Sequence, residues 1–251
     1  MTEWAWEPDD FAALWLGDAN DRIPELLRFT SRFAYRNEFE AHRATVRERY
    51  DSDEFEQIQL ALHTLNTSVM KIEILGGTTK YKGSDGTQRV YRIVGARNLY
   101  HAAVLYQFTQ GDTDGRIRLR LCRPESLAAA LAAPIPQRDP GTSAPITVHP
   151  ADLRDGQNGL TRNTPRERYL DLVNGPVDGG GSASLLVGAF HADVRPSNVV
   201  QWYDLPDGRY VETRAEQITV RPLHTRDLVT RFDSWIERAL QRLREDELDS
   251  W

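Results

Sequence analysis

The chain begins with segments whose apolar residues recur at helical spacing. Pro8 and two acidic residues precede the first such stripe, which is typical of the first turn of a short helix. Two further helices are predicted, the first capped by Asn37 and the second by Ser52, because each of these residues precedes an apolar stripe. Between the first helix and these two, residues 23–33 are extended in character.

From residue 69 the pattern changes to an alternation of apolar and polar residues, as in a strand with one buried face. In "VMKIEIL", for example, Ile72 and Ile74 face one side while Lys71 and Glu73 face the other. Turn-forming residues such as those in "GDTDG" separate the segments. The strands predicted in this run are 69–75, 89–94, 100–108 and 116–121, and a helix follows from Pro124.

The second part of the chain repeats this order. "IRLRLCRPESLAAAL" and "ITVRPLHTRDLVTRF" align without gaps, so that Ile117 matches Ile218 and Arg120 matches Arg221. A helix, a run of strands and a helix therefore occur twice, which indicates a structural duplication. The strands predicted here are 184–192, 198–205, 209–214 and 217–223; a helix starts at Thr225, another covers 165–173, and 154–164 and 175–182 are predicted loops.

Each repeat has a sheet with an apolar face that needs a cover. We therefore expect an α+β fold with a central antiparallel sheet, flanking helical bundles and two halves related by a pseudo-twofold axis. The proline-rich segment 134–144 would connect an N-terminal half, 1–133, to a C-terminal half, 145–251, within one globular unit.

Composition narrows the function class. The chain has 251 residues, of which 40% are hydrophobic and 27% charged, with a formal net charge of −6. This acidity argues against a nucleic-acid partner. No apolar run approaches the roughly 20 residues that span a bilayer, and the acidic N-terminus does not resemble a secretory signal. With Cys122 as the single cysteine, a cytoplasmic protein without a disulfide is expected.

Candidate catalytic chemistry is sparse, and no metal or cofactor is expected. His191 and Asp193 are two positions apart on a predicted strand, which would place a base and a partner on one face, although an ordinary histidine at a strand end explains them as well. The glycine-rich run "GPVDGGGSAS" precedes an apolar strand and lacks the lysine of a phosphate-binding loop.

The tip of the first predicted hairpin, residues 78–88, is long and polar. It contains Lys80 and Lys82, and Lys71 is the chain's third lysine. The corresponding turn in the second half, between Ala192 and Asn198, is predicted to be short, which would make the long tip an asymmetric addition. A loop of this length is either functional or loose, and the pattern alone leaves both interpretations open.

Three segments resemble the EspG proteins, cytosolic chaperones of actinobacterial type VII (ESX) secretion systems. The first is "EPDDFAALWLGDANDRIPELLRFTSRFAYRNEFEAHRATVRERY", with its Leu-Trp pair and Asp-Arg-x-Pro turn. The second is "RIRLRLCRPESLAAALAAPIP", and the third is "SNVVQWYDLPDGRYVE". Together they span most of the chain in the expected order. The chain is shorter than typical mycobacterial members, and its "DANDR" turn is looser than theirs, so the client is left open.

The resemblance implies the same antiparallel sheet with pseudo-twofold halves, and a non-catalytic function. Mycobacterial members bind the hydrophobic helical tip of PPE proteins in PE–PPE heterodimers, keep them soluble and help the secretion machinery to recognise them. In those relatives the equivalent of the hairpin tip takes part in the contact, with the sheet and the C-terminal helical region. The partner-binding residues expected here are Thr79, Lys80, Tyr81, Lys82, Ser84, Asp85 and, on the arginine-rich face of the last helix, Arg231 and Arg238.

Two alternatives belong to other classes of protein. The chain could be a structural module that forms a homo-oligomer without a client, which an exposed and self-complementary sheet edge would favour. It could also be an enzyme of unrecognised type that uses His191 in a pocket floored by the sheet.

Overall fold

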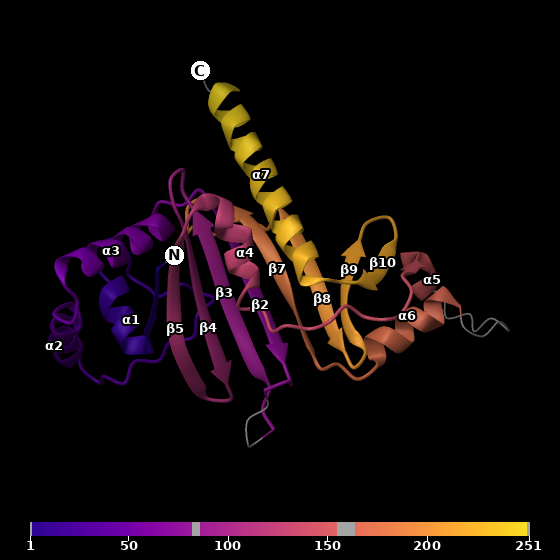
Figure 1. Ribbon diagram of the computed structural model, residues 1–251, viewed down its shortest axis with the longest axis horizontal. Coiled ribbons are helices and arrows are strands. Elements are labelled where there is room, and N and C mark those ends of the chain that lie inside the picture. Colours follow the sequence, from indigo (N-terminus) through magenta and orange to yellow (C-terminus); the bar gives the residue numbers. More distant parts are fainter. Residues whose placement is uncertain (1, 82–85, 155–163, 250–251) are drawn as a thin grey trace.

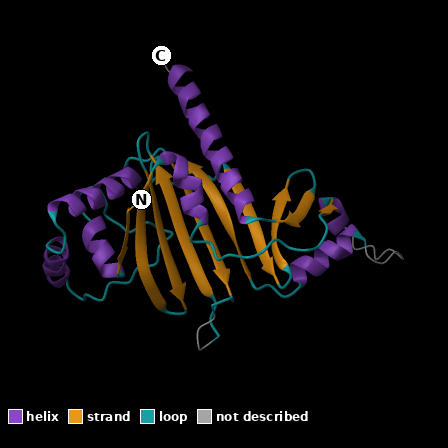
Figure 2. Ribbon diagram, viewed as in Figure 1, coloured by secondary structure: helices purple, strands orange, loops and turns teal. Residues whose placement is uncertain are grey.

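The computed structural model describes residues 2–81, 86–154 and 164–249, and within them one antiparallel sheet of ten strands forms the centre of the molecule (Figures 1 and 2). The predicted fold class is confirmed. The strands are β1 (Thr2–Trp6), β2 (Met70–Thr78), β3 (Arg89–Arg97), β4 (Ala102–Gln110), β5 (Thr113–Cys122), β6 (Ile146–Val148), β7 (Gly179–Val187), β8 (Asn198–Leu205), β9 (Gly208–Arg214) and β10 (Ile218–Pro222). The helices are α1 (Pro8–Trp15), α2 (Arg36–Arg47), α3 (Ser52–Asn66), α4 (Leu127–Ala132), α5 (Pro150–Arg154), α6 (Pro165–Asn174) and α7 (Thr225–Asp249).

The two repeats arrange their strands in the same order, counted outward from the centre of the sheet. It is β1-β5-β4-β3-β2-β7-β8-β9-β10-β6, so the first strands of the two runs, β2 and β7, pair at the centre. Their antiparallel register joins Ile72 to Leu185 and Ile74 to Ala183. Each run continues outward from this pair, and a short extra strand, β1 or β6, closes each edge. This order is the one that a duplication with a pseudo-twofold axis between β2 and β7 requires.

The glycine-rich run lies in a strand, so the predicted loop 175–182 and the predicted strand 184–192 are both wrong at this point. β7 begins at Gly179 and ends at Val187. Gly180 and Gly181 pair with Gly77 and Gly76 of β2 across the centre of the sheet. The absence of side chains leaves room for two buried rings: a Cβ at Gly76 would lie 2.2 Å from Cζ of Tyr91, and one at Gly181 would lie 2.6 Å from the Trp202 ring.

Apolar side chains form cores on both faces of the sheet. α4 and α7 pack together over one face, where their residues join the inward side chains of β2, β3, β7 and β8. On the opposite face, α1 and α3 cover the N-terminal half with Trp4 and Trp6 of β1. α6 packs over β6 and β10 in a third cluster around Tyr169 and Ile218. Helices therefore cover parts of both faces of the central sheet (Figure 1).

Element ends differ from the predictions where a cap or a pairing partner is involved. The helix assigned to an Asn37 cap begins at Arg36 after Tyr35, so Asn37 lies inside its first turn. The next helix is capped by Asp51, whose side chain accepts a hydrogen bond from the Glu54 amide, and Ser52 is its first residue. β1, β6 and α5 were not predicted, because each has only three to five residues and so short an element has no distinctive periodicity.

The predicted asymmetry of the two hairpin tips is also wrong. β2 ends at Thr78 and β3 begins at Arg89, which leaves ten connecting residues, 79–88. β7 ends at Val187 and β8 begins at Asn198, which again leaves ten residues, 188–197. We call these segments the first and second connections. They have the same length and the same place in each repeat.

Candidate partner-binding site

The first connection is held firmly where it leaves the sheet. The amide and the hydroxyl of Thr79 both donate to the carbonyl oxygen of Asp178, at 2.7 and 2.9 Å. The side-chain amide of Gln110 donates to the carbonyl oxygens of Tyr81 and Thr87, at 3.1 and 3.2 Å. Among the predicted contact residues, Lys82, Ser84 and Asp85 lie outside the described residues. The described part of the connection is thus a stem anchored to its neighbours.

Tyr81 is the exposed aromatic residue of this stem. Its side chain is 51% exposed. Two cations lie near its ring: Nζ of Lys80 and the guanidinium carbon of Arg89 are each 5.7 Å from the centroid. A rigid aromatic surface with adjacent positive charge can bind both apolar and acidic groups of a partner.

Lys80 opens onto a hollow between the stem and the start of α7. This Lys80 hollow has a volume of about 530 Å³ and is lined by Gln137, Arg138, Asp139, Pro206, Asp207, Gly208 and Thr225. Nζ of Lys80 lies 3.4 Å from the carbonyl oxygen of Gln137. The first connection, the segment between the two halves and the β8–β9 turn therefore meet at one place.

A buried ion pair positions the wall of the Lys80 hollow. Arg209 has no exposed surface, and its Nε donates to Oδ1 of Asp204 at 2.6 Å. Its Nη2 donates to Oδ2 of Asp204 and to the carbonyl oxygen of Pro136, both at 2.8 Å. A bidentate arginine–carboxylate pair of this kind is strongly directional. The motif "YDLPDGRY" thus ties the segment after α4 to the β8–β9 turn.

Arg231 and Arg238 lie together at a second hollow, on the side of α7 that faces β10. This arginine hollow has a volume of about 440 Å³ and is lined by Arg221, Asp227, Thr230, Arg231, Ser234, Trp235 and Arg238. The sequence-based prediction missed Arg221 as a contact residue, although Arg221 directly follows Val220 near the end of β10 and shortly before the helix begins. The first turn of α7 borders both hollows, since Thr225 lines one and Asp227 the other.

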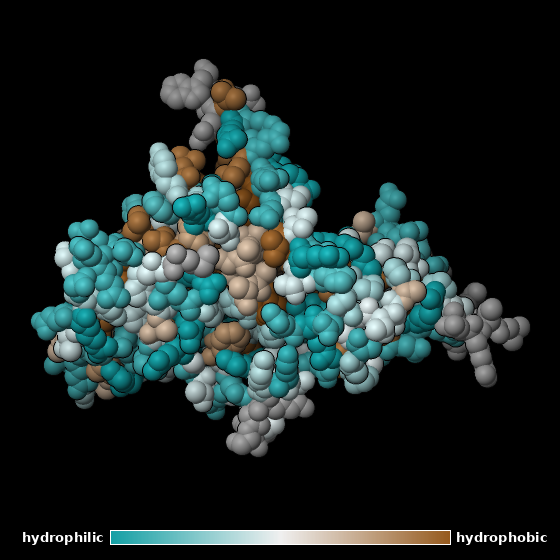
Figure 3. Space-filling view, viewed as in Figure 1, coloured by the Kyte–Doolittle hydropathy of each residue, from teal (hydrophilic) through white to brown (hydrophobic). Residues whose placement is uncertain are grey.

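The face that carries these hollows is largely hydrophilic. Figure 3 shows hydrophobic side chains gathered along α7 and over the neighbouring strands, with polar surface around them. Within the described residues, Leu99, Tyr100 and Leu248 are among the large apolar side chains that are more than 70% exposed. Leu99 and Tyr100 lie between β3 and β4, and Leu248 lies near the end of α7; they line neither hollow.

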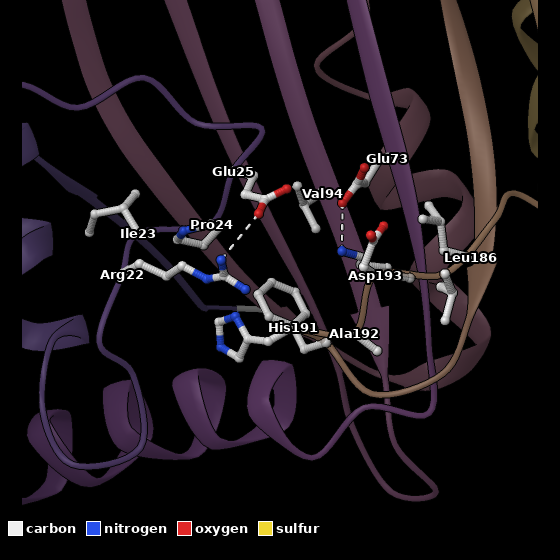
Figure 4. Close-up of a pocket in the computed structure, with 13 residues that line it drawn as sticks. Arg22, Ile23, Pro24, Glu25, Glu73, Val94, Leu186, His191, Ala192 and Asp193 are labelled. Carbon is white, nitrogen blue, oxygen red and sulfur yellow. Dashed lines mark ion pairs between the residues drawn. The ribbon is translucent and has the colours of Figure 1, made fainter.

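His191 lines a cavity on the opposite face of the sheet (Figure 4). The cavity has a volume of about 430 Å³ and lies between residues 22–25, the central strands and the second connection. Nε2 of His191 lies 2.8 Å from Oδ1 of Asn20. Partial burial of the ring lowers the pKa of His191 below its ordinary value of 6.5, and the charges of Arg22 and Lys71 lower it further.

Both cationic side chains that line this cavity are paired with a carboxylate of the same cavity. Arg22 pairs with Glu25 at 3.4 Å, and Lys71 pairs with Glu73 at 2.8 Å. The expected alignment of His191 with Asp193 is wrong, because β7 ends at Val187 and both residues lie in the second connection. In Figure 4 Asp193 lies toward Glu73, away from the imidazole ring. The cavity does not assemble a base with an orienting carboxylate.

Neither a metal-binding cluster nor a membrane-spanning helix occurs among the described residues. Across the described residues, histidine, cysteine and carboxylate side chains nowhere gather in groups of three or more that could hold a metal ion. In the same part of the chain, every helix is too short or too polar to cross a membrane.

Similarity to known proteins extends over most of the chain. The model of the EspG family matches residues 7–234. The structure is similar to that of the type VII secretion system chaperone EspG5 of Mycobacterium tuberculosis, solved in complex with the PE25–PPE41 dimer. The two chains are 15% identical, the TM-score is 0.57, and the similarity covers 91% of this chain and 94% of that one, which shows a shared fold. No curated protein sequence matches.

Proposed function

Because the chain belongs to the EspG family, we propose that it is a non-catalytic cytoplasmic chaperone of type VII secretion substrates. Its client would be a PPE or PPE-like protein within a PE–PPE-type heterodimer, bound at the apolar tip of its helices. The solved complex of the structural neighbour with a PE25–PPE41 dimer supports this class of partner. Covering an apolar helical tip reversibly would keep such a substrate from self-association before export.

The observation that carries the proposal is the anchored stem with its exposed Tyr81. A loose loop would lose much conformational entropy on binding, whereas this stem is already ordered by Thr79 and Gln110. Tyr81 supplies rigid contact area, and aromatic residues of this kind are enriched in the centres of interfaces. The exposure of Tyr81 and the two cations beside its ring support a role in binding.

The charged residues have a matching role in this proposal. Lys80 and Lys82 would reach the carbonyl oxygens at the C-terminal ends of client helices or acidic side chains near them. Thr79, Ser84 and Asp85 would supply hydrogen bonds around Tyr81. Arg231 and Arg238 would contact the client beside α7, since the first turn of that helix borders both hollows.

A direct test is to replace residues 79–87 with an Asn-Gly turn and to measure binding of the PE–PPE-like heterodimer encoded beside this chain by calorimetry. A loss of affinity of about tenfold or more is expected, because the aromatic anchor is removed. Undiminished affinity in a variant that melts like the wild type would contradict the proposal.

A pair of single substitutions gives a matched control. Tyr81 and Tyr100 are both exposed tyrosines, 51% and 77%, and they flank the two ends of β3. Tyr81→Ala should weaken client binding by roughly tenfold, and Tyr100→Ala should leave it within about twofold. Equal effects of the two substitutions would show that the stem has no special role.

A further inference from the structure

The arginine hollow gathers positive charge in a protein whose formal net charge is −6. Arg221 comes from β10, and Arg231 and Arg238 lie two turns apart on α7. In the described part of the chain, the guanidinium groups of Arg221 and Arg231 have neither a hydrogen bond nor an ion pair. Nε of Arg238 donates to the carbonyl oxygen of Ser234 at 3.0 Å, which leaves its two terminal nitrogens free to bind elsewhere.

The acidic residue that lines the hollow is engaged with its own surroundings. One oxygen of Asp227 accepts a hydrogen bond from the His224 amide at 3.2 Å. The other lies 3.9 Å from Nε of Arg226, outside the hollow. Burial lowers the pKa of Arg231 and the charge of Arg221 lowers it further, while the charge of Asp227 acts in the opposite direction. An anion bound between neighbouring like charges stabilises both.

The N-terminal half shows what binds at the equivalent place. Arg120 of β5 is the counterpart of Arg221 in the repeat, and the two face the same side of the sheet, opposite Val104 and Val211 of the neighbouring strands. Arg120 is occupied: its Nε donates to Oε2 of Glu3 at 2.8 Å. Arg118 and Tyr106 donate to the other oxygen of the same carboxylate, at 3.3 and 3.0 Å.

The C-terminal half lacks the strand position that would supply this carboxylate. Glu3 lies directly opposite Arg120 because β1 runs alongside β5. On the other edge, the pairing of β6 with β10 covers Ile218–Val220 and stops before Arg221. The repeat therefore has an internal carboxylate on one arginine and an open hollow at the other.

From these observations we propose that the arginine hollow is a carboxylate-binding site for an acidic segment of a partner protein. Arg221 and Arg231 would clamp a glutamate or aspartate side chain, as Arg120 and Arg118 clamp Glu3, and Arg238 would hold a second acidic residue. This inference deepens the proposed function and rests on it only for the identity of the partner.

The test uses the free protein and a peptide probe. An acetylated, amidated tetraglutamate peptide is titrated at low salt and followed by NMR through backbone amides and arginine Nε signals. Shifts confined to residues around 219–238 that saturate are expected, while tetraglutamine should produce none. Arg221→Gln should weaken binding by roughly tenfold, since it removes a charge-assisted hydrogen-bond donor.

The control is Arg242→Gln, because Arg242 is exposed on the same helix and does not line the hollow. It should change affinity less than twofold. Equal weakening by Arg221→Gln and Arg242→Gln would overturn the site and indicate general attraction to a basic helix. Arg231→Gln, checked for folding by thermal melting, should act as Arg221→Gln does.

Two further arms separate the remaining possibilities. Inorganic phosphate at matched ionic strength should bind more weakly than the peptide; tighter binding of phosphate would overturn the assignment to an acidic segment. If the wild-type protein binds the client but not the peptide, only the carboxylate-binding site is overturned. If it binds the peptide but no client, only the proposed function is overturned.

Discussion

The two ten-residue connections occupy the same place in each repeat and do different things. The second connection turns back onto the N-terminal core: Phe190 is 3% exposed, and its ring centroid lies 5.8 Å from that of Trp15. The first connection has no such anchor in its described part and leaves Tyr81 half exposed. Since length and position are equal, the difference comes from side chains. An apolar residue that reaches a core makes the second connection structural, whereas the described part of the first connection has no such residue and leaves Tyr81 exposed.

The two connections are also anchored by different kinds of contact. The first connection is held by hydrogen bonds to backbone oxygens at its base, through Thr79 and Gln110. The second is held by burial of Phe190 and by the contact of His191 with Asn20. Burial of a large ring stabilises a fold by several kcal/mol, whereas an exposed hydrogen bond contributes little. Substitutions in the second connection should therefore cost more stability than substitutions in the first.

Phe190→Ala should be the most damaging single change in either connection. It removes a buried ring from the N-terminal core, so the free energy of unfolding should fall by about 3–5 kcal/mol. Urea unfolding followed by tryptophan fluorescence measures this directly. A loss below about 1 kcal/mol would mean that the second connection is not part of the core and that the comparison fails.

Asn20→Ala should have a smaller effect on the same connection. Asn20 is 5% exposed, its Oδ1 accepts a hydrogen bond from Nε2 of His191, and its Nδ2 donates to the Trp15 carbonyl oxygen at 3.2 Å. Losing these buried contacts should lower the free energy of unfolding by about 1–2 kcal/mol. The matched change on the first connection is Gln110→Ala, for which a loss of less than about 1 kcal/mol is expected. The reverse order would contradict the proposed difference in anchoring.

The two equivalent arginines should differ in the pH dependence they confer. Burial alone would raise the pKa of Glu3, but hydrogen bonds from Arg120, Tyr106 and Arg118 outweigh it and hold the pKa below its ordinary value of 4.5. Because the folded-state pKa is the lower one, this stabilisation is complete above about pH 4.5 and is lost as the pH falls through the folded-state pKa.

Glu3→Gln should therefore flatten the fall of unfolding free energy below pH 4.5, as measured by urea titrations at several pH values. Exposed Glu48, changed to Gln, is the control and should leave the slope as it is in the wild type. An unchanged slope in Glu3→Gln would show that the carboxylate does not depend on Arg120, and would weaken the parallel with Arg221.

Tyr81→Ala should have the smallest effect on stability. Its side chain is half exposed and makes no core contact, so the free energy of unfolding should change by less than about 0.5 kcal/mol. The same variant should lose client affinity, as predicted above. A stability loss comparable to that of Phe190→Ala would show that both connections are structural.

Local pattern was sufficient for the interior of each repeat. The alternation in "NVVQWYDL" predicted a strand over 198–205, and β8 has these bounds because Val200 and Trp202 face the core while Val199 and Gln201 do not. The stripe after Thr225 likewise predicted α7. In such segments each residue's preference and its burial agree, so the sequence alone is enough.

Pairing partners decided what the pattern did not. Gly179–Gly181 favours a loop by composition, yet it forms a strand because Gly76 and Gly77 lie opposite it and the rings of Tyr91 and Trp202 fill the space. β1 has five residues and is stabilised by its pairing with β5. Neither partner is near in sequence.

The duplicated order of strands and helices follows from local periodicity and can therefore be predicted from the sequence. The burial of Phe190, the exposure of Tyr81 and the carboxylate at Arg120 where Arg221 has a hollow are visible only in the folded structure. These outcomes depend on which distant segments meet across the sheet. A side chain's burial and charge pairing are properties of that meeting, and no local pattern contains them.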